Sequence, residues 1–340
     1  MGEEETKLPG PGVQEVSSPL VPLESEPTET KIARPPITLG LSMIMKNEEA
    51  NIARTLASVE GIDEIVIVDT GSTDNSIMIA REMGATVIEG VYEWKDDFAD
   101  ARNFAIRQCK SSWLLLMDSD EVLQPGGIEA ARRVIEGGLD QFPNLQDVQC
   151  FVFHDKDEFY SDRLLINDPD NVFYLYPIHE FCNAQVKIRT DDVKIEFTPR
   201  PNQGRNFRMI DKYLSEHPDD LRMQYCAARE YFVAGHHPTS IYWFDRYLRN
   251  YAKLQPPGYE GEVADAHFTC GWAYGRLLDL DRAHYHLMKA IEINPDFKEA
   301  FEFLAQLALM KNKQLQAERW GVFASTAQNR GLNFKTKGVF

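Results

Sequence analysis

The sequence predicts an α/β domain built on a doubly wound, mostly parallel sheet, followed by an all-α domain of helical repeats. Short apolar runs alternate with helical periodicity between residues 37 and 121. Carboxylate residues directly follow several of these runs, and a repeated pattern of small and aromatic residues fills the C-terminal part of the chain. Alternation of this kind is typical of βαβ units, whose strands lie parallel in one sheet.

The first strand and helix follow a segment that lacks the composition of a folded domain. Residues 1–36 are rich in Pro, Glu, Ser and Thr and contain no aromatic residue, so we expect a disordered tail. An apolar strand is predicted at residues 37–45. Apolar side chains at helical spacing from Ile52 to Val59 predict the helix that follows it.

Two further strand and helix pairs continue the pattern. The second predicted strand, residues 64–69, is β-branched in its middle and ends at a turn. The helix after it stops at Gly84, because glycine favours the backbone conformation that ends a helix. A third strand at residues 85–89 and a third helix at residues 97–110 complete the alternation.

The fourth predicted strand, residues 111–117, leads directly into Asp118 and Asp120. Like Asn47 and Asp69, these residues follow the carboxyl end of a strand, where doubly wound sheets bind their ligands. Magnesium or manganese takes one or two protein carboxylates while a diphosphate supplies further ligands. The two aspartates are therefore candidates for a metal site, and the alternative is that they cap the next helix.

Residues 148–196 show a different pattern, with short strand-like runs and no long helical periodicity. We expect a smaller, mostly antiparallel part that covers the crevice at the strand ends and supplies an acceptor site. His179 and Glu180 lie within it.

The remaining chain, residues 206–329, is predicted to form helix pairs that resemble tetratricopeptide repeats. Units begin near His217, near Glu262 and after Pro295, which gives about the minimum number of pairs for a stable stack. We expect a scaffold or docking surface that binds a substrate molecule, a protein partner or a second copy of the chain. Residues 330–340 are a predicted tail.

The net charge and the cysteine content indicate which kinds of partner and which cellular compartment we expect. The net charge of -17 argues against binding to nucleic acid or to an anionic membrane surface. The 5 cysteines include no C-x-x-C pair, which indicates reduced, mostly buried thiols and a cytoplasmic protein. No apolar run approaches the ~20 residues of a membrane span, and no secretory signal is visible.

Four motifs follow the predicted strands in order. They are Met-Ile-Met-Lys-Asn-Glu at 43–48, Ile-Val-Asp-Thr-Gly-Ser-Thr-Asp at 67–74, Asp-Ala-Arg-Asn at 100–103 and Leu-Met-Asp-Ser-Asp-Glu at 116–121. Together they resemble the motifs of family 2 glycosyltransferases with the GT-A fold. The resemblance is strong over residues 37–125 and looser through Arg163 and His179, and it implies a GT-A domain over residues 37–205. The combination with tetratricopeptide repeats is similar to a known bacterial subgroup.

This resemblance implies an enzyme that transfers a sugar from a nucleoside diphosphate sugar, usually uridine-linked, with inversion at the anomeric carbon. It also implies a manganese or magnesium ion on the diphosphate. Asp69 would bind the base, Asp118 the ribose side, and Asn47, Glu48 and Arg102 would lie near the nucleotide. Asp120 would hold the metal and so contribute to catalysis, with Asp118 as a further ligand. His179 could complete the metal shell through a neutral ring nitrogen or donate a hydrogen bond to the phosphate. The acceptor, which could be a glycan, a lipid or a protein, stays open.

Inversion by a single displacement requires a base on the face opposite the leaving group. Glu180 is the candidate by the resemblance, because the family subgroup often shows a His-Glu pair here and a carboxylate is the usual base. Asp155, Asp157 and Glu158 are its rivals. On the alternative interpretation, His179 is a strand residue with structural partners and Glu180 is a surface residue.

Other interpretations compete for several of these features. Asp69 could cap the helix after it, Arg102 could pair with an acid group on its own helix, and Trp94 could stack on a sugar or belong to the core. A non-catalytic adaptor that uses the repeats is one alternative function, and a sugar nucleotidyltransferase is another. The latter class and the dehydrogenases both carry a glycine-rich loop after the first strand, which residues 46–49 do not provide.

Overall fold

The structure is a computed structural model that describes residues 36–141, 148–154, 160–196, 204–254 and 260–327. These residues form two compact units, one before residue 202 and one after it. We call them the sheet unit and the helical unit. The predicted tails, at 1–36 and 330–340, lie outside the described residues apart from residue 36.

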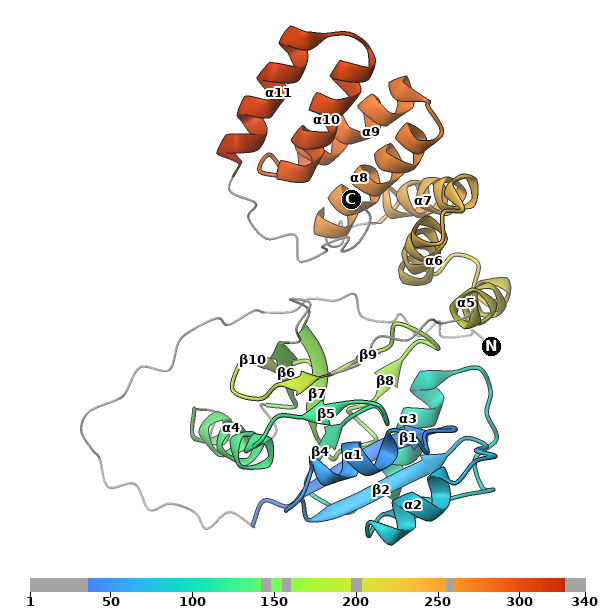
Figure 1. Ribbon diagram of the computed structural model, residues 1–340, viewed down its shortest axis with the longest axis vertical. Helices are drawn as coiled ribbons and strands as arrows, with labels where there is room; N and C mark the ends of the chain where they lie inside the picture. The colour runs from blue at the N-terminus through green and yellow to red at the C-terminus, as the bar shows by residue number, and fades with distance from the viewer. Residues whose placement is uncertain (1–35, 142–147, 155–159, 197–203, 255–259, 328–340) are drawn as a thin grey trace, which may run out of the picture. The chain divides into compact units, whose positions relative to one another are not determined.

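A seven-stranded sheet with the order β10-β6-β7-β4-β1-β2-β3 forms the centre of the sheet unit (Figure 1). Its parallel half consists of β1 (Leu39–Met45), β2 (Glu64–Asp69), β3 (Thr86–Ile88) and β4 (Trp113–Leu116). Strand β1 lies between β2 and β4, so the chain adds strands first on one side of β1 and then on the other. The predicted doubly wound, mostly parallel sheet is confirmed for this half, and its point of reversal lies beside β1.

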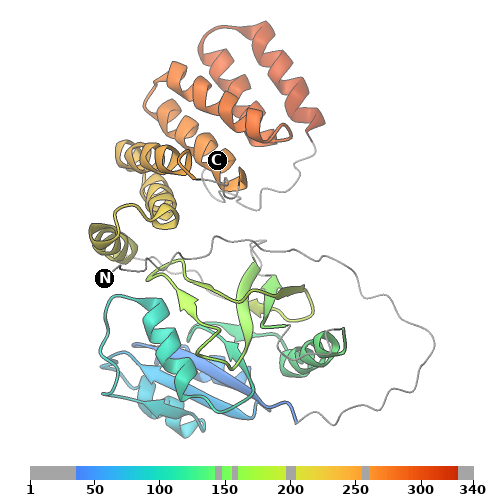
Figure 2. The same ribbon diagram turned by 180° about the vertical axis from the view of Figure 1, so that it is seen from behind.

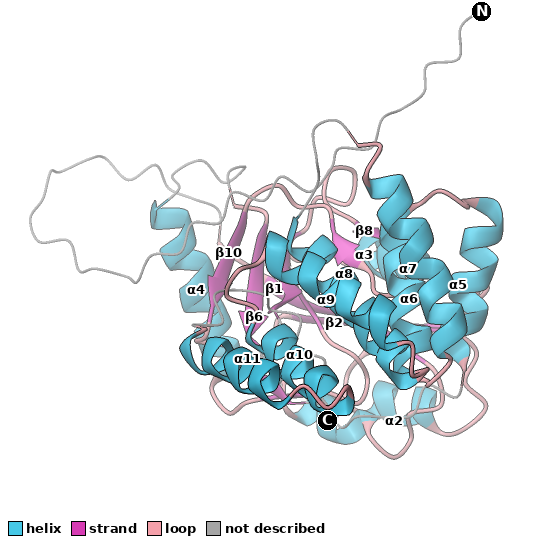
Figure 3. Ribbon diagram, turned by 90° about the horizontal axis from the view of Figure 1, so that it is seen from above, coloured by secondary structure: helices cyan, strands magenta, loops and turns pink. Residues whose placement is uncertain are grey.

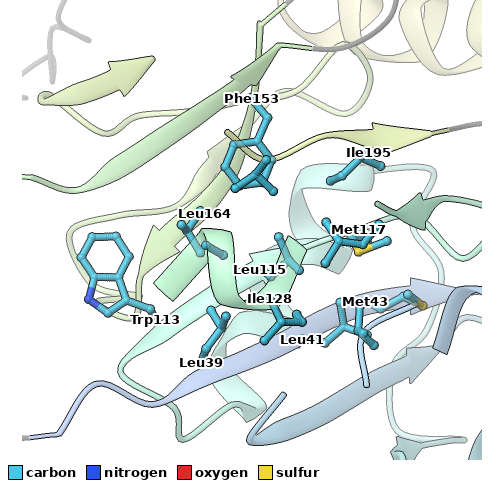
Figure 4. Close-up of a cluster of buried hydrophobic side chains, with 14 of the residues drawn as sticks. Leu39, Leu41, Met43, Trp113, Leu115, Met117, Ile128, Phe153, Leu164 and Ile195 are labelled. Carbon is cyan, nitrogen blue, oxygen red and sulfur yellow. The ribbon is translucent and has the colours of Figure 1, made fainter. Parts of the chain in front are cut away.

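Helices cover both faces of this sheet. Apolar side chains of α1 (Ile52–Ala57), α2 (Ser76–Glu82) and α4 (Gly127–Gln141) pack in one core with those of the strands. Figure 4 shows part of that core, with Leu39 and Met43 of β1, Leu115 of β4 and Ile128 of α4. Helix α3 (Phe98–Gln108) packs in separate clusters against the alternate side chains of β1, β2 and β4 and is seen in the reverse view (Figure 2).

The antiparallel strands after residue 148 extend the main sheet. Strand β7 (Tyr160–Ile166) pairs antiparallel with both β4 and β6 (Cys150–His154), and β10 (Lys187–Thr190) pairs parallel with β6. The predicted mostly antiparallel pairing is correct, and these strands join the main sheet because the open edge of β4 takes β7 as its hydrogen-bonding partner.

Two short antiparallel pairs of strands lie outside the main sheet. Strand β8 (Tyr174–Leu175) pairs with β9 (Phe181–Cys182), and β5 (Val122–Leu123) pairs with β11 (Ile195–Glu196). The loop between β8 and β9 carries His179 and Glu180.

The described residues of the helical unit form helices and no strands (Figure 3). The elements are α5 (Arg205–Glu216), α6 (Leu221–Val233), α7 (His237–Tyr251), α8 (Glu260–Arg276), α9 (Leu280–Ile293), α10 (Lys298–Met310) and α11 (Gln314–Thr326). Helices α6 to α11 pack as consecutive pairs, as predicted for tetratricopeptide-like repeats. Close packing explains the small residues, because a Cβ atom added at Gly271 of α8 would lie 3.1 Å from the carbonyl oxygen of Ala283 in α9.

Two sequence predictions concern the chain as a whole. All of the cysteines are buried and unpaired, as expected for reduced thiols. No helix of the described part of the chain is both long and apolar enough to cross a membrane.

Candidate active site at the strand ends

The strand ends bring the predicted residues to one edge of the sheet. In the register of β1 and β2, Met45 lies opposite Asp69, and in the register of β1 and β4, Ser42 lies opposite Leu116. Asp118 therefore emerges nearly level with Asp69, about 10 Å away across two strand spacings. Asn47 and Asp120 leave the same edge. We call this edge, with the loop between β8 and β9, the sheet-edge site.

Asp69 is buried, with 4% of its surface exposed, and its two carboxylate oxygens have different surroundings. Oδ2 accepts hydrogen bonds from the backbone N–H groups of Gly71 and Ser72, both at 2.9 Å. Oδ1 is buried without a hydrogen-bond partner among the described residues. Asp69 thus fixes the loop before α2, whose N-cap is Asn75, and presents one unpaired acceptor. Such an acceptor costs about 1–3 kcal/mol in the absence of a donor.

Asn47 and Glu48 tie the loop after β1 to the loop after β2. Asn47 has a left-handed backbone, with φ 55°, and its Oδ1 accepts the N–H of Thr73 at 2.7 Å. Its own N–H donates to Ser72 Oγ at 2.9 Å, and the N–H of the buried Glu48 donates to Ser76 Oγ at 2.6 Å. These contacts set the relative positions of the two loops that flank Asp69.

Arg102 is the centre of an ion-pair network that links three segments. Its Nη2 contacts Asp118 Oδ1 at 2.7 Å and its Nε contacts Glu180 Oε1 at 2.8 Å. Burial alone would lower the pKa of Arg102, but the charges of Asp118 and Glu180 raise it well above its ordinary value. Arg102 therefore joins α3 to the loop after β4 and to the loop between β8 and β9, and does not pair with an acid group on its own helix.

A second ion pair, between Glu121 and Arg163, supports the first. The buried Glu121 accepts from Arg163 at 2.6 Å (Oε1 to Nη2) and at 3.0 Å (Oε2 to Nη1). Its Oε2 also accepts the backbone N–H of Asp118 at 2.8 Å. Burial raises the pKa of Glu121 to about 7, against the charge of Arg163. Glu121 is thus a positioning residue for the Asp118 turn, and sequence reasoning gave it no role because its partner is on β7.

Asp118 and Asp120 lie in a turn that is attached to helix α1. The backbone oxygen of Asp120 accepts from Arg54 Nη2 at 3.4 Å, and that of Ser119 accepts from Thr55 Oγ1 at 3.0 Å. The side chain of Asp118 is 43% exposed and that of Asp120 is partly exposed, so both are reachable from solvent.

These carboxylates fit a magnesium or manganese ion by the chemistry of their donors. Such an ion needs only one or two protein carboxylates, since water and phosphate oxygens complete its shell. Among the described residues, Asp118, Asp120 and His179 do not form a group whose ligand atoms all lie within 4.8 Å of one another. The donor set therefore fits an ion shared with a diphosphate better than one enclosed by protein.

The loop between β8 and β9 holds its residues in an uncommon backbone conformation. Tyr176 and His179 have positive φ values, 73° and 53°, which cost about 1–3 kcal/mol each and cluster at functional sites. The carbonyl of Pro177 accepts the N–H of Phe98 at 2.9 Å, which attaches the loop to the start of α3. His179 is exposed in this loop, so it is not a strand residue, and Glu180, whose side chain is 14% exposed, is not a surface residue.

Two neighbouring side chains have structural contacts. Asn103 Nδ2 donates to the carbonyl of Tyr174 at 2.8 Å and its Oδ1 accepts the N–H of Tyr174 at 2.7 Å, so Asn103 holds β8. Trp94 donates to Asp96 Oδ1 at 3.0 Å and packs edge-on against Phe98. The rival bases Asp155, Asp157 and Glu158 lie outside the described residues.

Known proteins resemble different stretches of the chain. An uncharacterized glycosyltransferase of Rickettsia typhi is 44% identical over 82 residues, 24% of this chain and 27% of that protein. A TPR repeat-containing protein of Synechococcus elongatus is 42% identical over 86 residues, 25% of this chain and 21% of that protein. The chain thus spans about a quarter of the length of these curated relatives.

One solved structure is glucosyl-3-phosphoglycerate synthase from Mycobacterium tuberculosis in complex with Mn2+, uridine diphosphate and phosphoglyceric acid. It is 13% identical, with a TM-score of 0.40, and the match covers 53% of this chain and 78% of that one. The family model described as glycosyl transferase family 2 matches residues 41–214, about half of the 340 residues. By this match, the chain belongs to glycosyl transferase family 2.

Proposed function

We propose that the chain transfers a sugar from a nucleoside diphosphate sugar, with uridine as the nucleoside, to an acceptor with inversion at the anomeric carbon. The observation that carries this proposal is the sheet-edge site, where the unpaired Oδ1 of Asp69 lies at the same edge as the Arg102 network. Family membership supports the reaction class.

Asp69 is proposed to bind the base. Uracil has one ring N–H donor beside its carbonyl groups, and Oδ1 of Asp69 is a buried acceptor without a donor. A base that donates to Oδ1 removes the cost of that unpaired atom, whereas a base without a donor at this position leaves it. Asn47 and Glu48 contribute by fixing the two loops around Asp69.

Asp120 is proposed to hold a magnesium or manganese ion, with Asp118 and His179 near it. When bound, the ion would offset the negative charge that develops on the departing diphosphate. Arg102 contributes a fixed positive charge at the same edge, and its two ion pairs keep Asp118 and Glu180 in place before substrate binds.

Glu180 is proposed as the base that takes the acceptor proton. Its Oε1 is bound by Arg102, while Oε2 receives no hydrogen bond from the described residues and is available to a hydroxyl group. The left-handed backbone at His179 fixes the direction of the loop that carries it. The helical unit is proposed to recognise the acceptor, a protein partner or a second copy. The cytoplasm is the proposed location, because reducing compartments keep thiols unpaired.

The test is a screen of nucleotide sugars for release of nucleoside diphosphate by the full chain, with manganese, with magnesium and with chelator. We expect release from a uridine diphosphate sugar that depends on the cation. In parallel, UDP with manganese should raise the unfolding midpoint, since a ligand that binds only the folded state stabilises it.

Asp69→Asn tests the proposed contact with the base, because it keeps the size of the side chain but replaces one acceptor oxygen with an NH2 group. We expect its affinity for UDP to fall about tenfold or more, with a smaller change for an adenine nucleotide. An unfolding midpoint that responds to no nucleoside diphosphate, together with no release from any nucleotide sugar, would favour the adaptor function and contradict this proposal.

A further inference from the structure

Three ligand-type side chains meet between helices α7, α8 and α9 of the helical unit. They are Asp245 on α7, Cys270 on α8 and His286 on α9, and their ligand atoms all lie within 4.8 Å of one another. Within the described ranges, this is the one group of three such side chains that the structure brings together. The group lies beyond residues 41–214, so the glycosyltransferase family match does not account for it.

The spacing of the sulfur and the imidazole fits two ligands of one tetrahedral ion. Cys270 Sγ and His286 Nε2 are 3.7 Å apart. In a tetrahedral zinc site, with Zn–S near 2.3 Å and Zn–N near 2.0 Å, these two atoms lie about 3.5 Å apart. A thiol that donates to the imidazole also spans this distance, so the distance alone does not separate a hydrogen bond from a metal site.

His267 supplies the partner that a metal-bound histidine requires. Its Nδ1 lies 3.0 Å from Nδ1 of His286, so one ring must donate to the other. When His286 donates through Nδ1, its Nε2 carries a lone pair toward Cys270. Metal-ligating histidines typically donate their second N–H to a carboxylate, a backbone carbonyl or water, and here the ring nitrogen of His267 takes that place.

The charges of the group match those of a divalent cation. A doubly charged ion would balance one thiolate, from Cys270, and one carboxylate, from Asp245. Arg282, the nearby cation on α9, is engaged by Asp279, with Nε 2.6 Å from Oδ2. Asp245 is only partly buried and gives the ion a route from solvent.

We propose that Asp245, Cys270 and His286 bind a zinc-type divalent cation that fastens α7 to the α8–α9 pair, with His267 as a positioning residue. On binding, a metal–sulfur bond replaces the S–H bond, the thiol proton passes to solvent and no group is oxidised or reduced. Sulfur and imidazole ligands favour zinc over the magnesium or manganese proposed for the sheet-edge site. The two sites are therefore chemically distinct.

The experiment uses the full chain, stripped of metal with a chelator, and cobalt(II) as the probe. A cobalt–thiolate bond gives a charge-transfer absorption band that carboxylates and imidazoles do not give. We expect this band at one equivalent of cobalt, and we expect zinc to displace the cobalt and remove the band. Asp120→Asn should keep the band, since the sheet-edge site has no thiolate.

Variants assign the band to these residues. Cys270→Ser should abolish it, Asp245→Asn should weaken cobalt affinity about tenfold or more, and His267→Phe should weaken it about 10–100-fold. The matched controls are Cys226→Ser, a buried cysteine on α6, and His284→Asn, two residues from His286. Both should keep the wild-type affinity.

Two results would overturn the proposal. One is the absence of the band in the wild-type chain, which would leave a thiol–imidazole hydrogen bond as the explanation. The other is a band that survives Cys270→Ser or disappears in Cys226→Ser. If circular dichroism shows that Cys270→Ser does not fold, the partly exposed Asp245→Asn decides the matter, and unchanged cobalt affinity in that variant contradicts the proposal.

Discussion

Each unit of the chain contains an arginine held among acidic or hydroxyl groups, and the surroundings of the two arginines differ. In the sheet unit, Arg102 pairs with Asp118, which is 43% exposed, and with Glu180. In the helical unit, Arg229 lies 3.6 Å from Asp265, which is 1% exposed, and Tyr225 donates to Asp265 Oδ2 at 2.5 Å. The first, which we call the open network, reaches solvent through the carboxylate of Asp118. In the second, which we call the closed network, the carboxylate of Asp265 is buried.

Buried ionisable groups alone do not mark an active site, because both units contain them. Asp69 Oδ1 and Asp265 Oδ1 are both buried without a hydrogen-bond partner among the described residues. Asp69 lies at strand ends beside accessible carboxylates, whereas Asp265 lies between α6 and α8 with its other oxygen bound to Tyr225. Position at the sheet edge and access from solvent therefore support the proposed role of Asp69 and distinguish it from Asp265.

The largest effect is expected from Asp120→Asn at the open network. The amide is a weaker ligand for a hard cation than a carboxylate, so turnover should fall on the order of 1000-fold, which is about 4 kcal/mol of transition-state stabilisation. Stability should hardly change, because the side chain is partly exposed. The measurement is cation-dependent release of nucleoside diphosphate. Asp281→Asn, at an exposed Asp-x-Asp triplet on α9, is the control and should keep full turnover.

In the closed network, loss of the arginine should lower the free energy of unfolding and leave turnover unchanged. Arg229→Met leaves the buried Asp265 without its cation, and removing one partner of a buried ion pair costs about 3 kcal/mol of unfolding free energy. Turnover per folded molecule should not change. Urea unfolding gives the first quantity and the release assay the second. Arg246→Met, whose partner Asp219 is 83% exposed, should cost less than about 1 kcal/mol. A large loss of turnover in folded Arg229→Met would contradict the distinction between the two networks.

The sequence predicts the fold best where local chemistry and topology agree. Residues 64–69 are β-branched and end at a turn, and the structure has β2 at Glu64–Asp69. Helix α4 (Gly127–Gln141) was not predicted, since it contains three glycines that disfavour helix formation. Strand β7 (Tyr160–Ile166) was missed because Ser161, Asp162 and Arg163 interrupt its apolar pattern.

The strand-end residues could be predicted for the same reason, whereas their pairing could not. Parallel strands place their carboxyl ends together, so Asp69 and Asp118 had to share an edge. Arg102 lies 78 positions before Glu180, and their contact depends on how the loop between β8 and β9 folds onto α3. Cys270 and His286 are 16 positions apart on two helices, and only helix packing brings them together.

In the open network, Arg102→Met should lower the affinity for substrate more than it lowers the stability of the fold. Loss of the guanidinium frees Asp118 to be hydrated, so the stability cost should be about 1–2 kcal/mol, below that of Arg229→Met. Affinity for UDP with manganese should fall by about tenfold or more. Arg102→Lys should not restore it, because one ammonium group cannot bind two carboxylates with the fixed geometry of a guanidinium. Full rescue by lysine would mean that only the charge of Arg102 matters.

The smallest expected effect is the change with pH in the free energy of unfolding that arises from Asp265 in the closed network. Burial raises the pKa of Asp265, although Arg229 and the hydrogen bond from Tyr225 act against it. The carboxyl group of Asp265 has a pKa of about 4 in the unfolded state. Above that pH, the folded state therefore binds more protons at Asp265 than the unfolded state does. The contribution of this group to stability is lost as the pH rises through the folded pKa. Asp265→Asn cannot titrate, so its unfolding free energy relative to wild type should rise over this interval, by no more than about 1.4 kcal/mol per pH unit. Urea unfolding at several pH values measures the difference, with Asp219→Asn as the exposed control, and a relative stability that falls with pH would show that Arg229 outweighs burial.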